Sequence, residues 1–175
     1  MTSPTSEHTV PSGAIATAMA WVEALHGRDG GALPEDHAAM LIAESKRWGW
    51  ETITAALGLL IGVAADQLTP GPAERSAPGP NDQDLIHVLV PAVVTRMRRI
   101  ELAEVPDHAL PTVSGIVTAA ALGQDPYAWR TAMGPVTAAD SLVFCYTLWL
   151  LIELLDGLLG PGSFGGIVAK VLDQG

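Results

Sequence analysis

The chain has 175 residues, of which 49% are hydrophobic, a single cysteine, and a formal net charge of -10 at pH 7. Its length suits one domain that buries well over half of its unfolded surface, so a disulfide framework is not needed. The strong negative charge argues against a nucleic-acid-binding protein, since nucleic acid is a polyanion, and favours neutral, basic or apolar partners.

A polar tail and three helices are predicted for the first part of the chain. Residues 1–12 have neither the basic nor the apolar region of a secretory signal, and we therefore expect a cytoplasmic protein. Apolar residues recur at the helical spacing over 14–26, 34–47 and 50–68. A proline and two carboxylates at the start of the second helix, and glycines after the first and second, support these bounds.

Small residues gather along one side of the helix predicted over 50–68, and they include Gly58 and Gly62. Each glycine inside a helix costs roughly 1 kcal/mol against alanine. We therefore predict that a neighbouring helix backbone approaches this side closely. The alternative is that small residues have accumulated there without any such contact.

A proline-rich loop is predicted over 69–81, TPGPAERSAPGPN, which has no apolar periodicity. It is the clearest internal boundary in the chain, and it separates an N-terminal half, 13–68, from a C-terminal half, 82–175. We nevertheless predict one domain over 13–175, because the N-terminal half alone would make a marginal core.

Further helices are predicted for the C-terminal half from apolar spacing and from the turn residues between segments. Thr137 and Asp140 match a capping box, and Pro91 should kink the helix that contains it. No segment shows the alternation typical of a strand, so we predict an all-α fold, a single-domain bundle of about seven to eight helices. These C-terminal helices are expected over 82–104, 112–122, 126–133, 141–159 and 164–172.

The segment 141–159, SLVFCYTLWLLIELLDGLL, is expected to form the centre of the core. A helix that is apolar nearly all round must be covered by other helices or by a second copy of the protein. Its uncharged run, 141–152, and the earlier run, 52–65, are both shorter than the roughly 18 to 20 residues of a transmembrane helix. We therefore predict no membrane span. Cys145 is expected to be a small buried hydrophobe rather than a nucleophile.

Two short internal similarities suggest a duplication. Residues 25–29 resemble 122–125, and residues 66–71 resemble 156–162. A true repeat would place two related halves around the central helix. The alternative is that similar turn chemistry occurs twice by chance.

Two acid-x-x-His motifs raise the hypothesis of a metal site, because this spacing puts a carboxylate and an imidazole on one helix face. The alternative has a solvated glutamate and histidines at the rim of the core, and on balance we predict no bound metal and no cofactor. The candidate ligands are Glu23, His26, Asp84 and His87, with Glu44 and Glu153 available from further helices.

One stripe of the central helix carries polar and amphipathic residues, namely Tyr146, Trp149, Glu153 and Asp156. If the two carboxylates were buried together, their pKa values would be perturbed and they could act as an acid and a base. The alternative is that the stripe is the solvated side of the helix. His37, in the first turn of another helix, is a further weak candidate for a base, against a neutral histidine at the edge of the core.

Arg96, Arg98 and Arg99 form a basic cluster near the end of a predicted helix. They could clamp a phosphate or another anionic ligand. The alternative is a solvated helix end, partly paired with Glu101 and Glu104.

The chain has five tryptophans but only two phenylalanines. Trp48 and Trp50 flank Gly49 at a predicted helix junction, where half-exposed rings could anchor an interface, as could Trp149 and Tyr146. The alternative is that these rings only cover the core.

Two functions from different classes remain open. The first is a non-catalytic cytoplasmic helical interaction or regulatory protein that forms a homodimer or binds another protein. The second is a small helical enzyme or ligand-binding protein with an apolar pocket between helices and acidic or histidine groups at its mouth.

Overall fold

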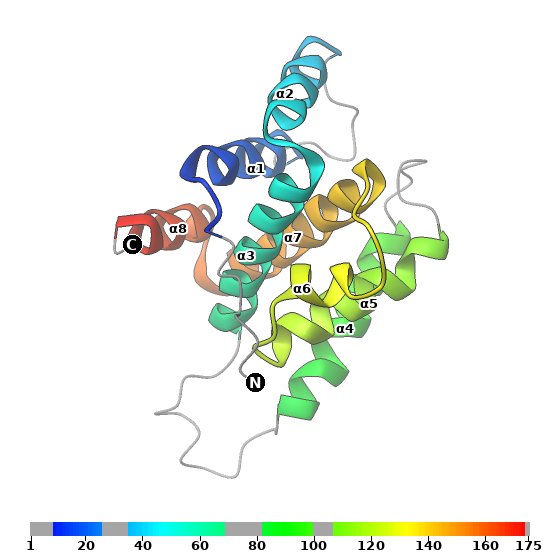
Figure 1. The fold of residues 1–175 in the computed structure, drawn as a ribbon. Helices are drawn as coiled ribbons and strands as arrows, with labels where there is room; N and C mark the ends of the chain where they lie inside the picture. The colour runs from blue at the N-terminus through cyan, green and yellow to red at the C-terminus, as the bar shows by residue number, and fades with distance from the viewer. Residues whose placement is uncertain (1–8, 26–34, 69–81, 100–106, 174–175) are drawn as a thin grey trace, which may run out of the picture.

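The computed structural model describes residues 9–25, 35–68, 82–99 and 107–173, and these residues form helices and turns without any strand. This confirms the predicted all-α fold. The described elements are α1 (Ser12–Leu25), α2 (Glu35–Trp48), α3 (Trp50–Leu68), α4 (Asp82–Arg99), the 3-10 turn η2 (Asp107–Ala109), α5 (Leu110–Ala121), α6 (Pro126–Thr131), α7 (Ala138–Leu159) and α8 (Ser163–Asp173) (Figure 1).

Two helix starts follow from local capping chemistry. Asp125 precedes Pro126 at the start of α6, and its Oδ1 accepts a hydrogen bond from the backbone N–H of Tyr127 at 2.8 Å. Before α7, Thr137 and Asp140 form a capping box, in which Asp140 Oδ2 accepts from the Thr137 backbone N–H at 2.8 Å. Both sets of capping residues are as predicted, although α7 begins at Ala138, three residues before the predicted segment 141–159.

The start of α5 differs from the prediction. The helix begins at Leu110 rather than at Thr112, and Ala109 occupies the cap position without a side-chain hydrogen bond. Pro111 fits within the first turn, where no backbone donor is needed, so the helix continues directly from the 3-10 turn. Residues 100–104 of the predicted fourth helix lie outside the described residues.

The core is built around α3 and α7, which pack against each other in the middle of the molecule (Figure 1). Helices α1 and α8 lie to one side, and α4, α5 and α6 lie to the other. Phe144, Leu148, Leu151 and Leu155 on α7 are completely buried. The predicted central helix is therefore covered by other helices of the same chain over most of its length.

Helices α3 and α7 are as long as transmembrane helices, although the uncharged runs within them, 52–65 and 141–152, are shorter than a membrane span. They have 19 and 22 residues, with mean hydropathies of 1.3 and 1.9, and both are long and apolar enough to cross a membrane by length and composition. In each, 56% of the most apolar window is buried within the fold. Core helices of soluble proteins have the same length and composition, so these two features are weak evidence for a span.

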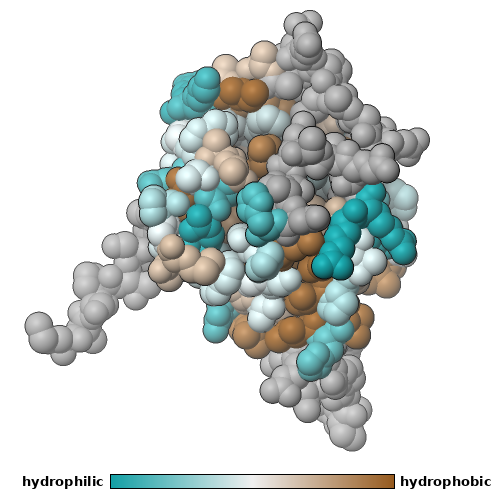
Figure 2. Space-filling view, turned by 90° about the vertical axis from the view of Figure 1, so that its right-hand side faces the viewer, coloured by the Kyte–Doolittle hydropathy of each residue, from teal (hydrophilic) through white to brown (hydrophobic). Residues whose placement is uncertain are grey.

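Large exposed apolar side chains are distributed over several elements. Figure 2 looks onto the side of the molecule that carries α4 and α5, where hydrophobic surface is interrupted by hydrophilic residues. The exposed large hydrophobic residues are Met40, Ile42, Leu59, Val88, Leu122, Met133, Leu158 and Leu159. Leu158 and Leu159 are adjacent at the end of α7, which is the only part of that helix with fully exposed leucines.

The two glycines of α3 have different surroundings. A Cβ atom added to Gly58 would lie 3.0 Å from the Tyr127 Cβ and 3.2 Å from its backbone nitrogen, so α6 approaches the α3 backbone closely there. A Cβ added to Gly62 would meet nothing within 4 Å. The predicted close contact is confirmed for Gly58 and is wrong for Gly62.

Two tryptophan rings lie directly against the backbone of a neighbouring helix at a glycine. Trp48 of α2 contacts Gly13 of α1, and Trp129 of α6 contacts Gly115 of α5, with no room for a Cβ at either glycine. In both cases the glycine precedes the tryptophan by one helix along the chain. This likeness is compatible with the suggested duplication, which stays a prediction.

Candidate functional site

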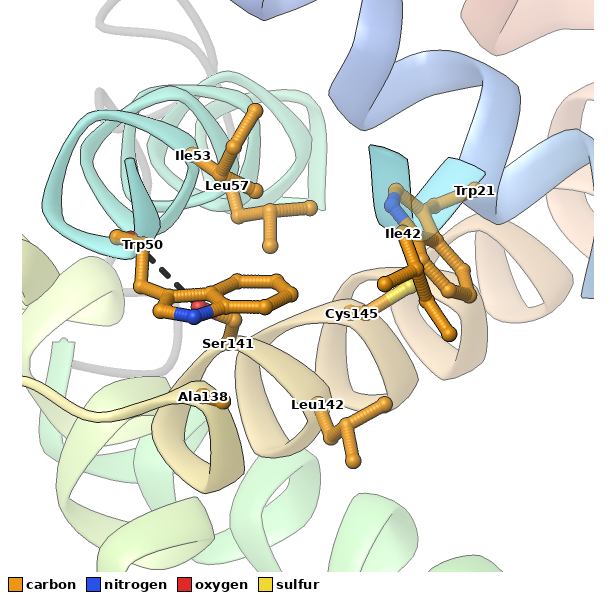
Figure 3. A pocket seen from close by; sticks show the side chains of 9 residues that line it. All are labelled: Trp21, Ile42, Trp50, Ile53, Leu57, Ala138, Ser141, Leu142 and Cys145. Atoms are coloured by element: carbon orange, nitrogen blue, oxygen red, sulfur yellow. Dashed lines mark hydrogen bonds between the residues drawn. The ribbon is translucent and has the colours of Figure 1, made fainter. Parts of the chain in front are cut away.

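An apolar cavity of about 240 Å³ lies between α1, α2, α3 and α7, and we call it the tryptophan cavity. Figure 3 shows the side chains that line it. They are Trp21 from α1, Ile42 from α2, Trp50, Ile53 and Leu57 from α3, and Ala138, Ser141, Leu142 and Cys145 from α7.

Helical spacing explains how these residues meet. The α3 residues occupy positions i, i+3 and i+7, and the α7 residues occupy i, i+3, i+4 and i+7, so each helix contributes one stripe. The stripes face each other because α3 packs along α7. Gly49, with φ of +85°, connects α2 to α3 without any further residue and so places Ile42 beside the α3 stripe.

The two tryptophans lie on opposite sides of the cavity (Figure 3). The Trp21 Nε1–H donates a hydrogen bond to the Ser45 Oγ at 2.8 Å, and Ser45 is completely buried but does not line the cavity. The one polar atom of the Trp21 ring is therefore satisfied by α2, and the ring presents carbon atoms to the cavity.

The Ser141 hydroxyl is also satisfied by protein atoms. Thr54 has one hydroxyl hydrogen and donates it to the Trp50 backbone carbonyl oxygen at 2.7 Å. The Ser141 Oγ lies 2.7 Å from the Thr54 Oγ1 and 3.4 Å from the Trp50 carbonyl oxygen, so its one hydrogen is donated to one of these two protein atoms (Figure 3). With both hydroxyl hydrogens used in this way, the surface that lines the cavity is entirely apolar.

Cys145 contributes its sulfur to the wall, on the side of Trp21 and Ile42 (Figure 3). The residue is buried, and this burial raises the pKa of its thiol to about 12. The thiol is therefore protonated near neutral pH and is a poor nucleophile. This confirms the prediction of a small buried hydrophobe. The cavity thus has no lining group that could act as an acid, a base or a nucleophile at that pH.

The predicted carboxylate pair on α7 does not form a site of its own. Glu153 is exposed, whereas Asp156 is half-buried and its Oδ1 accepts a hydrogen bond from the Ser163 Oγ at 3.3 Å. Tyr146 is buried and packs edge-on against Trp149, with ring centroids 6.4 Å apart, so the stripe is not solvated along its whole length. Asp156 instead shares with Glu23 a second hollow of about 270 Å³, which the sequence did not indicate.

The candidate metal ligands are not brought together within the described residues, where no group of three or more His, Cys, Asp or Glu could hold a metal ion. Glu23, Glu44, His87 and Glu153 are each exposed there. His26 and the side chains of His37 and Asp84 lie outside the described residues. The absence of a bound metal or cofactor stays a prediction.

The basic cluster is confined to the end of α4, where Arg96, Arg98 and Arg99 are all exposed. Their expected partners Glu101 and Glu104 lie outside the described residues. An anion clamp stays a prediction.

The tryptophans proposed as interface anchors are all half-buried within the chain. Trp48 lies on Gly13, with the Arg47 guanidinium 5.8 Å from its ring centroid, and Trp50 lines the cavity. The indole nitrogens of Trp48 and Trp149 are buried without a hydrogen-bond partner in the described structure. Covering the core is thus at least part of what these rings do, and the interface role stays a prediction.

A third hollow, of about 450 Å³, lies beside Gly58 and Gly62 and is lined by both apolar and polar residues, including Asp66 and Asp125. Tyr127 also lines it, and the pKa of its hydroxyl is raised by burial and by the nearby charges of Glu51 and Asp125. The tryptophan cavity differs from both other hollows in having no charged residue in its wall.

Comparisons of the chain with protein-family models, with curated proteins and with solved structures each find no match. The functional assignment below therefore rests on the geometry of the tryptophan cavity.

Proposed function

We propose that this chain is a non-catalytic cytoplasmic helical protein that binds a small apolar molecule in the tryptophan cavity. The observation that carries the proposal is a cavity built from four helices whose surface exposes no polar atom, with the Trp21 N–H and the Ser141 hydroxyl hydrogen-bonded to protein. Binding there needs no desolvation of a charged or unpaired polar group, so burial of the ligand surface is the main driving force. The proposed protein is non-catalytic, as in the first hypothesis, and has an apolar pocket between helices, as in the second. The pocket has no acidic residue or histidine in its wall.

The cavity volume supports a ligand of limited size. Engineered cavities of about 150 Å³ lined by apolar side chains stay dry and bind benzene or xenon. The tryptophan cavity, at about 240 Å³, has more room than these. It is smaller than the roughly 300 to 1,000 Å³ of pockets that hold drug-sized ligands.

Xenon is a suitable probe, because it occupies apolar cavities without requiring any hydrogen bond. We expect saturable xenon binding by NMR to the unmodified protein and to Cys145→Ala, which removes the thiol without filling the space. Cys145→Leu places a larger side chain in the cavity and should weaken the binding relative to Cys145→Ala. Ile42→Trp, which blocks the same space from α2, provides a second variant if Cys145→Leu does not fold.

The comparison of the two Cys145 variants separates volume from thiol chemistry. If xenon does not bind the unmodified protein, or binds equally well after Cys145→Leu and Ile42→Trp, the cavity is not a binding site and the proposed function is wrong. Circular dichroism melting of each variant verifies that the helical fold is retained.

Self-association is a further proposal, and burial within one chain weakens the argument for it. The expectation of a homodimer came from an apolar helix without sufficient cover, yet the middle of α7 is covered within one chain. Leu158 and Leu159 are the exposed apolar residues of α7 that could still favour pairing.

A further inference from the structure

We infer that the molecule held in the tryptophan cavity is a neutral aromatic compound of about two fused rings that carries no charged group. This inference rests on the proposed function and names the chemical class of the ligand. It follows from three properties of the wall, namely its volume, its lack of free polar atoms and the placement of two indole rings.

The volume selects the size. A cavity of about 150 Å³ holds benzene, and a second fused ring adds about half the volume of the first again. The tryptophan cavity, at about 240 Å³, exceeds the benzene-binding volume by a similar proportion. A single ring would leave part of the wall without contacts, whereas two fused rings match the volume.

The wall selects against charge. The Trp21 N–H donates to Ser45, and the Ser141 hydroxyl is held by Thr54 and the Trp50 carbonyl oxygen, so neither hydrogen is free for a ligand. None of the lining residues is acidic or basic, and a charged group inside the cavity would lose its hydration without compensation. The net charge of -10 acts further against anions.

The indole rings select for an aromatic ligand over a saturated one of the same size. Trp21 and Trp50 lie on opposite sides of the cavity, so a flat ring between them can meet both in stacked or edge-to-face contact (Figure 3). The Cys145 S–H adds a weak donor that can point at a ring face. Aromatic pairs of this kind correspond to an affinity about two- to tenfold tighter than that of a saturated ring.

The test is an NMR titration with three probes of related size, namely naphthalene, its saturated analogue decalin and naphthalene-2-carboxylate. We expect naphthalene to bind about two- to tenfold more tightly than decalin, and the carboxylate to give no saturable shift. In Trp50→Leu the preference for naphthalene over decalin should fall, whereas Trp50→Phe, which keeps a ring at this position, should retain most of it. Trp21→Leu is the second variant if Trp50→Leu does not fold.

The possible outcomes separate this inference from the proposed function. If xenon binds but decalin binds as tightly as naphthalene, or the carboxylate binds as tightly as naphthalene, the ligand class is wrong while the cavity remains a binding site. If neither xenon nor any of the three probes binds, the proposed function is wrong as well. Xenon binding together with an unchanged preference in both Trp50→Leu and Trp21→Leu would overturn the role given to the indole rings.

Discussion

Arg130 and Asp140 form a two-point ion pair that joins the end of α6 to the start of α7. The Arg130 Nε lies 2.7 Å from Asp140 Oδ1, and its Nη2 lies 3.0 Å from Oδ2. Arg130 also donates from Nη1 to the Gly134 carbonyl oxygen at 3.2 Å, so the pair fixes the connection between the two helices. The two side chains are only 15% and 13% exposed, which makes this pair stronger than a typical surface salt bridge.

The first prediction concerns pH and Asp140. Burial alone would raise the pKa of its carboxyl, but hydrogen bonds from Arg130 and Thr137 and the charge of Arg130 outweigh burial, and the pKa is lowered from 3.8. A lowered pKa in the folded state means that the stabilisation is complete above the unfolded value and is lost as the pH falls through the folded value.

We therefore expect Asp140→Asn to lower the free energy of unfolding by about 2 to 4 kcal/mol at pH 7, because Arg130 loses its partner. The difference from the unmodified protein should shrink below pH 3.8, the unshifted carboxyl value, where Asp140 itself becomes protonated. Urea unfolding at several pH values measures this. Asp125→Asn is the matched control, since asparagine also caps a helix well, and it should change little at any pH. A difference that stays constant down to pH 2 would contradict the prediction.

The second prediction uses the two glycines of α3 as a matched pair. Gly62→Ala should stabilise the protein by about 1 kcal/mol, because it lowers the backbone entropy of the unfolded chain and the added Cβ meets no neighbouring atom. Gly58→Ala gains the same stabilisation from replacing a helical glycine, but its Cβ pushes against Tyr127. It should therefore be less stable than Gly62→Ala by about 1 to 2 kcal/mol. Thermal unfolding of both variants tests this, and equal stabilities would show that α6 moves away at little cost.

The third prediction concerns filling of the tryptophan cavity. Cys145→Leu should be more stable than Cys145→Ala by about 1 to 3 kcal/mol, because the leucine fills empty space whereas the alanine enlarges it. In a fully packed core the larger side chain would instead be the destabilising one. Chemical denaturation of the two variants decides between these cases, with an unchanged denaturant slope required to show that both unfold as cooperative domains.

The fourth prediction concerns the hydrogen bond between Trp21 and Ser45. Ser45→Ala leaves a partly buried indole N–H without its partner and should destabilise by about 1 to 3 kcal/mol. Ser114→Ala is the control, since that hydroxyl only bonds back to the Leu110 carbonyl oxygen within its own helix. Its effect should be below about 1 kcal/mol. Similar losses in both variants would mean that the bond between α1 and α2 has no special weight.

The fifth prediction is self-association, tested by light scattering at micromolar concentration. One chain has a mass of 18.2 kDa, so a homodimer should give about twice that value. If the pairing uses the end of α7, Leu158→Lys should return the mass to that of one chain, because a charge is placed on an exposed apolar residue. A mass near 18.2 kDa for the unmodified protein would remove the homodimer from consideration.

Local signals in the sequence predicted most of the helices. The bounds of α3 follow from apolar spacing, and α6 and α7 start at residues with recognisable capping chemistry. The start of α5 was missed because no side chain caps it, and Pro111, which lies in its first turn, was assigned to the preceding connection. The difference between Gly58 and Gly62 was missed because it depends on where Tyr127 lies, and that is set by tertiary packing.

The tryptophan cavity could not be predicted because its wall is assembled from residues that are distant in the chain. Trp50 and Cys145 drew attention as an unusual aromatic residue and an isolated thiol, but nothing in the sequence placed them beside Trp21 and Ile42. The excess of tryptophan over phenylalanine was the available signal. It indicated that indole rings matter in this protein, without showing which of them face the same space.

The helices that form the cavity wall differ in how deeply they are buried in the core. The wall residues of α3 and α7 lie on helices that are largely buried in the core. Ile42 lies on α2, where only Leu41 and Ser45 are buried among the described side chains. Helix α2 packs mainly against α1 and α3 among the described helices, and the Trp21–Ser45 hydrogen bond links its side chains to α1. A ligand that touches Ile42 would add contacts to this less buried helix, so we expect hydrogen exchange to slow more in α2 than in α3 or α7 when the cavity is occupied.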